Sequence, residues 1–206
     1  TVPAYLNVLD KDKSIIMMEK FAQNDFSSDW GVRMVGKSYP KFNPRSYHFG
    51  SIWPLFTGWT SLAEYATERS IQGFTRIMDN LMNYKSFALG RVSEVLHGER
   101  YEQSGVTQFQ CWSETMVIQP IVEGMLGFNP DALDNRFELN LSIPFNWDTL
   151  SVNNLKIKDN SISLEMDKSE DRVIYKFEAR KQVGLNFNPE IPLNTQVNSV
   201  VANGEK

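Results

Sequence analysis

One acidic side chain in this sequence has surroundings suited to acid–base chemistry. Glu94 lies in residues 90–112, a polar stretch punctuated by glycine that separates two patterns typical of helices. The apolar residues Val92 and Val95 flank it, and a glutamine-rich and tryptophan-containing segment follows. Loops on a rigid scaffold are where catalytic groups are usually presented. We therefore predict that Glu94 is a catalytic base.

Other acids and another role stay open at this point. A glutamate in a loop is most often solvated, so a plain solvated role for Glu94 stands beside the catalytic one. Glu99 and Glu102 have more polar surroundings, while Glu114 lies one helical turn from Gln110. These three acids are the rivals of Glu94.

Aromatic and hydrogen-bonding side chains near the acid indicate what it would act on. The C–H face of a pyranose packs on a flat ring and expels water, so the predicted ligand is a carbohydrate. The candidate binding residues are Trp30, Tyr47, His48, Trp53, Gln110 and Trp112. Each aromatic ring alone has a core role as its alternative, and His48 has a structural one. Arg33 is expected to pair with an acid of the site or of its own loop.

Composition excludes several classes of function. The chain has 206 residues, 41% of them hydrophobic, with a net charge of -4, so it lacks the positive surface that nucleic acid or an anionic membrane requires. It has no apolar run long enough to span a bilayer. Two histidines and the lone Cys111 predict neither an internal disulfide nor a metal site. We expect no cofactor, no nucleic-acid partner and no membrane partner.

The first part of the chain has helical periodicity. Helices are predicted over residues 12–21, 54–69, 70–85 and 108–126. Pro54 suits a first helical turn, because its missing N–H would have no partner there, and the short link at residue 70 predicts a helical hairpin. Pro120 predicts a kink in the last helix. Residues 24–52, rich in glycine, proline and aromatic residues, are expected to form a packed loop that contributes to the site.

After residue 128 the helical spacing gives way to alternation. Strands are predicted over residues 136–143, 155–158, 161–166, 173–179, 182–187 and 196–202. A run of helices followed by a run of strands indicates an α+β chain with two segregated units. The predicted units are a helical domain, residues 1–128, and a small antiparallel β domain, residues 129–206.

Five short segments carry a resemblance to a known family. They are WGVRM at residues 30–34, FNPRSYHFGSIWP at 42–54, GRVSEVLHG at 90–98, QCWS at 110–113 and GFNPD at 127–131. In type and order they resemble segments of bacterial glycogen-debranching-like proteins, the amylo-α-1,6-glucosidase-like members of the (α/α)6-toroid glycoside hydrolases. The resemblance extends over roughly residues 28–165.

This resemblance implies a fold and an activity. Residues 1–128 would be the C-terminal portion of the toroid's helical layer, and Glu94 matches the family's general base for α-glucosidic, glycogen-like or oligosaccharide substrates. The family's general acid belongs upstream of the residues present, and the chain lacks an initiating Met. We therefore expect a C-terminal fragment with little or no activity alone. Its expected partners are the carbohydrate and either the missing N-terminal part of the enzyme or another copy of the chain.

Two departures from the family pattern affect the substrate. Phe49 stands where the family has asparagine, and residues 55–57 (LFT) stand where it commonly has HDN. These positions help line the sugar pocket in relatives, so the resemblance does not fix the sugar.

Two functions of other classes remain beside hydrolysis. The first is a carbohydrate-binding domain without catalysis, which would use the same aromatic residues. The second is a structural or assembly domain, in which the incomplete helical layer packs against another chain and an apolar face is exposed. An aromatic-lined hollow around Glu94 would favour the enzyme.

Overall fold

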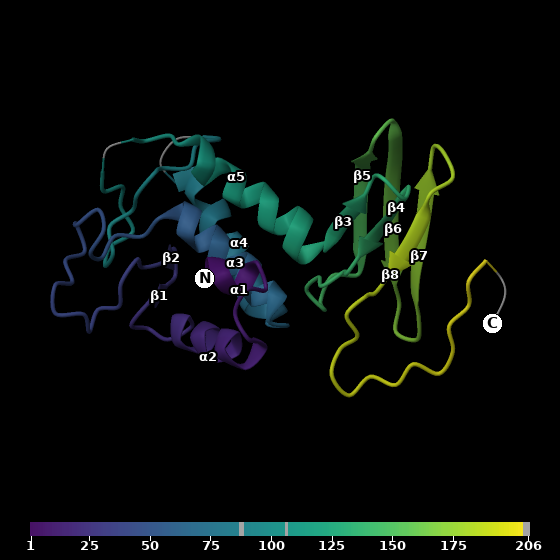
Figure 1. Cartoon of the computed structure of the whole chain (residues 1–206), viewed down its shortest axis with the longest axis horizontal. Helices are drawn as coiled ribbons and strands as arrows, with labels where there is room; N and C mark the ends of the chain where they lie inside the picture. The colour runs from purple at the N-terminus through teal and green to yellow at the C-terminus, as the bar shows by residue number, and fades with distance from the viewer. Residues whose placement is uncertain (87–88, 106, 204–206) are drawn as a thin grey trace.

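The chain consists of a helical half that leads into a half made of strands (Figure 1). The computed structural model describes residues 1–86, 89–105 and 107–203. The helices are α1 (Val2–Tyr5), α2 (Lys11–Phe21), α3 (Pro54–Ala66), α4 (Ser70–Ser86), α5 (Cys111–Gln119) and the π-helical turn η1 (Pro120–Met125). The mixture of helices with the sheets that follow them confirms the predicted α+β class.

Local sequence explains where the helices begin. Asp10 caps α2, since its Oδ1 accepts hydrogen bonds from the backbone N–H groups of Asp12 and Lys13 at 3.1 and 3.4 Å. Gln110 was predicted to lie inside the last helix but is its N-cap, because its Oε1 accepts from the N–H of Cys111 at 3.1 Å. The helix therefore starts three residues later than predicted.

Pro120 changes the hydrogen-bond pattern of the last helix, and the kink predicted there stays a prediction. It begins η1, in which the N–H of Leu126 donates to the carbonyl of Ile121 at 2.9 Å, a spacing of five residues. Proline has no N–H for the regular ladder, and the wider π-turn is one way for a helix to accommodate that loss.

Side-chain amides and hydroxyls hold α3 and α4 together as an antiparallel hairpin. The Oγ of Ser61 donates to the carbonyl of Gly73 at 2.7 Å, and the Nδ2 of Asn80 donates to the carbonyl of Pro54 at 2.9 Å. The same Asn80 amide also reaches the carbonyl of Met116 in α5 at 3.2 Å. One buried asparagine thus fixes three helices at the end where α3 begins.

The orientation of α4 is unusual, because its polar face is the buried one. The buried side chains include Arg76, Asp79, Asn80 and Asn83. The exposed side chains include Ile71, Met78 and Met82. Their spacing places these three apolar residues on one stripe of the helix.

An ion pair on the buried face of α4 fastens a distant loop. The Nη1 of Arg76 lies 2.7 Å from the Oδ2 of Asp79, and both side chains are buried. Arg76 also donates to the Oγ of Ser27 and, at 3.4 Å, to the carbonyl of Ser28. These residues form β1 (Ser27–Ser28), which pairs with β2 (Gly31–Val32) in the long loop before α3.

The strand half contains two small sheets. Their strands are β3 (Phe128–Asp131), β4 (Arg136–Leu139), β5 (Thr149–Ile157), β6 (Asn160–Lys168), β7 (Val173–Ala179) and β8 (Gly184–Phe187). One sheet has the order β5-β6-β7 and is antiparallel throughout. The other has the order β3-β4-β8, and its β4–β8 pair is parallel. The predicted antiparallel β domain is therefore wrong for that one pair of strands.

Apolar side chains from both sheets make one core. Alternating residues of β4, β5 and β6 point inward, and the buried cluster comprises Leu126, Phe137, Leu139, Leu141, Leu155, Ile157, Ile162 and Leu164. Leu126 directly follows η1, so the strand core reaches the helical half. The ring of Phe74 in α4 also packs edge-on against Trp147 at 5.7 Å between centroids.

One predicted strand is absent. Residues 196–202 form no regular strand, and their valines are exposed. Figure 1 shows this segment as part of the extended strap that follows β8. Valine content favoured a strand, but no neighbouring strand within the described chain pairs with it over that length.

Asp79 generates a prediction about stability. Burial raises the pKa of Asp79 to about 6, although the Arg76 guanidinium opposes that rise. The folded state then holds this proton more tightly than the unfolded chain, whose Asp pKa is about 3.9. Asp79 therefore contributes stability below about pH 4 and loses that contribution as the pH rises through about 6.

The measurement is the free energy of unfolding in urea for the wild type and Asp79→Asn. The difference, wild type minus variant, should fall by roughly 3 kcal/mol between about pH 4 and about pH 7. A difference that stays constant over this range would show that Asp79 titrates alike in both states.

Candidate active site

Glu94 lies on a buried segment instead of an open loop. Residues 92–98 are all buried, and Glu94 itself is only 6% exposed. The segment is held by paired backbone hydrogen bonds between Leu96 and Ile52, at 2.8 and 2.9 Å, and by the N–H of Glu94 donating to the carbonyl of Thr107 at 3.0 Å. The plain role of a solvated loop acid is therefore wrong.

A tyrosine supplies the hydrogen bond that the buried carboxylate needs. The hydroxyl of Tyr47 donates to the Oε1 of Glu94 at 2.7 Å, across 47 positions of sequence. This hydrogen bond, together with burial and the charge of Glu94, raises the pKa of Tyr47 to about 12. The phenol therefore stays protonated and keeps donating over the whole physiological range.

The second carboxylate oxygen of Glu94, Oε2, has different surroundings from Oε1. Its Oε2 accepts no hydrogen bond from the part of the chain that the structure describes, and Glu94 forms no ion pair there. Oε2 is also not one of the fully shielded side-chain atoms that lack a partner. The small exposed fraction of Glu94 is therefore consistent with an Oε2 atom that reaches solvent.

Tyr47 is itself fixed from two sides. Its carbonyl accepts a hydrogen bond from the Nε1 of Trp53 at 2.8 Å and one from the Oγ of Ser51 at 2.8 Å. Its ring meets that of Trp53 edge-on, with the centroids 4.4 Å apart. Trp53 directly precedes α3, so the start of that helix determines where the tyrosine hydroxyl points.

Four of the predicted binding residues gather around this point. The rings of Tyr47 and His48 meet at 4.8 Å, and those of His48 and Trp53 stack at 6.0 Å with an angle of 19°. Trp53 in turn stacks with Trp112 at 6.4 Å and 29°. His48 is exposed, and its ring makes no hydrogen bond to the described residues. The four rings form a cluster beside Glu94.

The two other predicted binding residues, Trp30 and Gln110, have structural roles. The Nε1 of Trp30 donates to the carbonyl of His97 at 3.0 Å, and its ring lies 6.1 Å from that of Tyr101. Trp30 thus lies against the far end of the buried segment. Gln110 uses its Oε1 as the cap of α5.

The rival acids have separate environments. Glu99 is exposed, and Glu102 pairs with Arg100 at 2.7 Å on the surface. Glu114 is half-buried, and its Oε1 is fully shielded without a hydrogen-bond partner among the described residues. Of these acids, only Glu94 combines burial with a tyrosine donor and nearby stacked rings.

Arg33 has a role other than the expected pairing with an acid. Its buried guanidinium donates to three carbonyls: from Nε to Gly98 at 2.6 Å, and from Nη1 to Ser27 at 2.6 Å and Asn24 at 3.3 Å. Burial lowers the pKa of Arg33, but arginine remains charged at neutral pH. This arginine joins the long loop to the end of the buried segment.

His97 is a residue near the site that the sequence did not single out. It is buried, its Nδ1 accepts from the N–H of Glu99 at 3.1 Å, and Arg100 lies close to its Nε2. Desolvation, assisted by the charge of Arg100, lowers the pKa of His97. It is therefore neutral at physiological pH and shapes the loop that follows Glu94.

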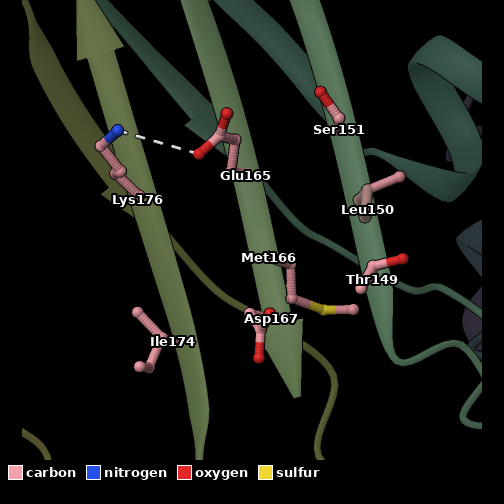
Figure 2. Close-up of a pocket in the computed structure, with 8 residues that line it drawn as sticks. All are labelled: Thr149, Leu150, Ser151, Glu165, Met166, Asp167, Ile174 and Lys176. Atoms are coloured by element: carbon pink, nitrogen blue, oxygen red, sulfur yellow. Dashed lines mark ion pairs between the residues drawn. The ribbon is translucent and has the colours of Figure 1, made fainter.

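Two hollows that the structure defines lie away from Glu94. One, of about 440 Å³, covers the outer face of the β5-β6-β7 sheet (Figure 2). There Glu165 lies between its cross-strand neighbours Ser151 and Lys176, whose Nζ is 3.8 Å from Glu165 Oε2. These are ordinary polar residues of a solvated sheet face. The other hollow, about 380 Å³, lies between α1, α2 and the end of α3. The aromatic-lined hollow expected around Glu94 stays a prediction.

The remaining expectations concern metals and membranes. No cluster of three or more His, Cys, Asp or Glu side chains in the described ranges is arranged to hold a metal ion. Among the same residues, no helix is long and apolar enough to cross a membrane. Comparison with models of known protein families and with curated protein sequences gives no match.

The hydrogen bond between Tyr47 and Glu94 generates a prediction. The phenol of Tyr47 should remain protonated at about pH 11, because its pKa lies at about 12. Glu94→Gln replaces the charged acceptor with a neutral amide, so the pKa of Tyr47 should fall toward its ordinary value of about 10. The measurement is the ¹³Cζ chemical shift of labelled tyrosine, with the Tyr47 signal assigned from Tyr47→Phe.

Glu102→Gln is the matched control, since this acid lies on the same loop but pairs with Arg100. It should leave the Tyr47 titration unchanged. A Tyr47 signal that titrates near pH 10 in both the wild type and Glu94→Gln would contradict the geometry.

Proposed function

We propose that this chain is a C-terminal portion of a glycoside hydrolase that acts on α-glucosidic substrates, with Glu94 as the general base. The observation that supports this most is the buried Glu94 carboxylate, hydrogen-bonded by Tyr47 at 2.7 Å beside a cluster of stacked rings. Burying a carboxylate is costly, so a buried acid with a donor and no ion pair among the described residues fits a functional group better than a structural one.

The roles of the individual residues follow from the chemistry. An inverting glycosidase needs a base that activates water on the face of the sugar opposite the acid. Tyr47 holds one oxygen of Glu94 and leaves Oε2 for that water. Trp112 is exposed and stacks on the buried Trp53 at 6.4 Å, so its ring offers a flat apolar surface for the sugar. His48, exposed beside Trp53, is suited to bond a sugar hydroxyl.

The finer fold belongs to the same proposal. We infer that the helices before residue 128 are part of an (α/α)6 toroid, whose other helices and general acid are supplied by an N-terminal part of the enzyme. The apolar stripe of Ile71, Met78 and Met82 on α4 supports this, because an exposed stripe of this kind favours packing against further helices.

The departures from the family pattern have different surroundings. Thr57 is buried, and its Oγ1 accepts from the N–H of Val32 at 3.0 Å, so it holds the β1–β2 hairpin on α3. Phe49, in contrast, is exposed beside His48. Of these two positions, Phe49 is the one that can contact a ligand.

A carbohydrate-binding domain without catalysis is the first alternative. It uses the same four rings and leaves Glu94 as an acceptor for sugar hydroxyls. It differs from the hydrolase only in turnover, so an assay of bond cleavage separates the two.

The hydrolase proposal predicts the effect of one mutation. In a longer polypeptide that carries the family's acid-bearing helical segment ahead of Thr1, Glu94→Gln should lower kcat on α-glucosides by roughly 10²–10⁴-fold, because it removes the general base. Release of reducing sugar is the measurement. Glu99→Gln, a neighbouring exposed acid, should retain activity. Full turnover by Glu94→Gln would remove this assignment.

An assembly domain is the second alternative, and the apolar stripe on α4 favours it. It predicts self-association of the chain through that stripe and no binding of sugars. Sedimentation velocity over a range of concentrations measures this, and Met82→Lys should abolish any association. A monomer at all concentrations that binds oligosaccharides would contradict the assembly role.

A further inference from the structure

Residues 51–53 form a short segment that is fixed relative to the candidate base. Ile52, at its centre, makes antiparallel bridges with Arg33 on one side and with Leu96 on the other. All three residues of the segment are buried. Leu96 belongs to the same buried stretch as Glu94, so the place of residues 51–53 is set by the backbone that carries the acid.

The two side chains that flank Ile52 hold one carbonyl. The Oγ of Ser51 and the Nε1 of Trp53 each donate to the carbonyl of Tyr47 at 2.8 Å. Side chains two positions apart in an extended segment lie on the same side, which explains why both reach the same atom. The ring of Trp53 also meets the ring of Tyr47 edge-on at 4.4 Å between centroids. Tyr47 is therefore held both at its backbone and at its ring.

The burial of Trp53 leaves its ring little surface for a ligand. Trp53 is only 9% exposed, and its indole N–H is taken by the carbonyl of Tyr47. The rings of Tyr47, His48 and Trp112 pack around it at 4.4, 6.0 and 6.4 Å. These contacts connect Trp53 with its neighbours in the site, whereas Trp112 is 42% exposed.

We propose that Trp53, assisted by Ser51, is a positioning residue that directs the hydroxyl of Tyr47 onto Glu94 without touching the substrate itself. The hydroxyl lies at the far end of a rigid ring, so a small shift of the Tyr47 backbone moves it away from the carboxylate. A hydrogen bond weakens steeply when its distance and angle depart from the best values. The catalytic consequence of this role rests on the proposed function, since Glu94 is the general base only there.

The test follows the ¹³Cζ signal of Tyr47 against pH in the chain as it exists. Trp53→Phe keeps an aromatic ring and removes the indole N–H, while Ser51→Ala removes the other donor to the same carbonyl. Each variant should lower the pKa of Tyr47 from about 12 to about 11, because the hydroxyl loses part of its bond to Glu94. The double variant should bring this pKa closer to the ordinary value of about 10.

Trp30→Phe is the matched control. It also removes an indole N–H that donates to a carbonyl, that of His97 at 3.0 Å, at the far end of the segment that carries Glu94. It should leave the pKa of Tyr47 at about 12. A Tyr47 signal that still titrates near pH 12 in Trp53→Phe or in Ser51→Ala, with native circular dichroism, would overturn the positioning role. Ser51→Ala, the milder change, decides the question if Trp53→Phe does not fold.

Isothermal titration with maltohexaose separates this inference from the proposed function. Trp53→Phe should bind the sugar as tightly as the wild type, whereas Trp112→Ala should bind it about tenfold more weakly. Weakened binding by Trp53→Phe with an unchanged pKa of Tyr47 would make Trp53 a ligand contact and overturn the inference. A wild type that binds no sugar, with a Tyr47 pKa that falls in both variants, would support the positioning role and contradict the proposed function.

Discussion

The hydrogen bond from Tyr47 to Glu94 is the interaction on which the site depends. A carboxylate that is 6% exposed loses most of its water, and an unsatisfied buried acid costs several kcal/mol. One charge-assisted hydrogen bond contributes roughly 1.5–3 kcal/mol, so this donor has to be held accurately. The chain achieves this by pairing Leu96 with Ile52, which brings the two loops that carry the acid and the tyrosine side by side.

The helical half serves as the support for those loops. Trp53 bonds the carbonyl of Tyr47 and is followed by the first residue of α3, while Asn80 ties that same residue, Pro54, to α5. Arg33 and Arg76 each donate to carbonyls of the loop around Ser27, which lies between α2 and α3. Buried polar side chains therefore hold the helices and the long loop together. The polar face of α4 is turned inward for this purpose, so its apolar stripe faces solvent.

Periodicity in the sequence predicted the elements well and their ends less well. The helices around Pro54 and Ser70 and the strands of the β5-β6-β7 sheet were predicted, because each has a sustained pattern of apolar spacing. Residues 196–202 were predicted wrongly, since valine content says nothing about whether a neighbouring strand is present. The cap formed by Gln110 and the π-turn at Pro120 were not predicted, because both depend on single hydrogen bonds that periodicity does not record.

Several residues of the candidate site were singled out from the sequence, but their contacts were not. Glu94, Tyr47, His48, Trp53 and Trp112 lie together, yet nothing in the spacing of Tyr47 and Glu94 indicates their hydrogen bond. The most direct measurement is a crystal structure of the chain with a bound maltose-type oligosaccharide. The account predicts a sugar ring packed on the exposed Trp112, with Glu94 Oε2 within hydrogen-bond reach of a water beside the sugar. A sugar bound elsewhere, with the Glu94 carboxylate sealed from it, would contradict the account.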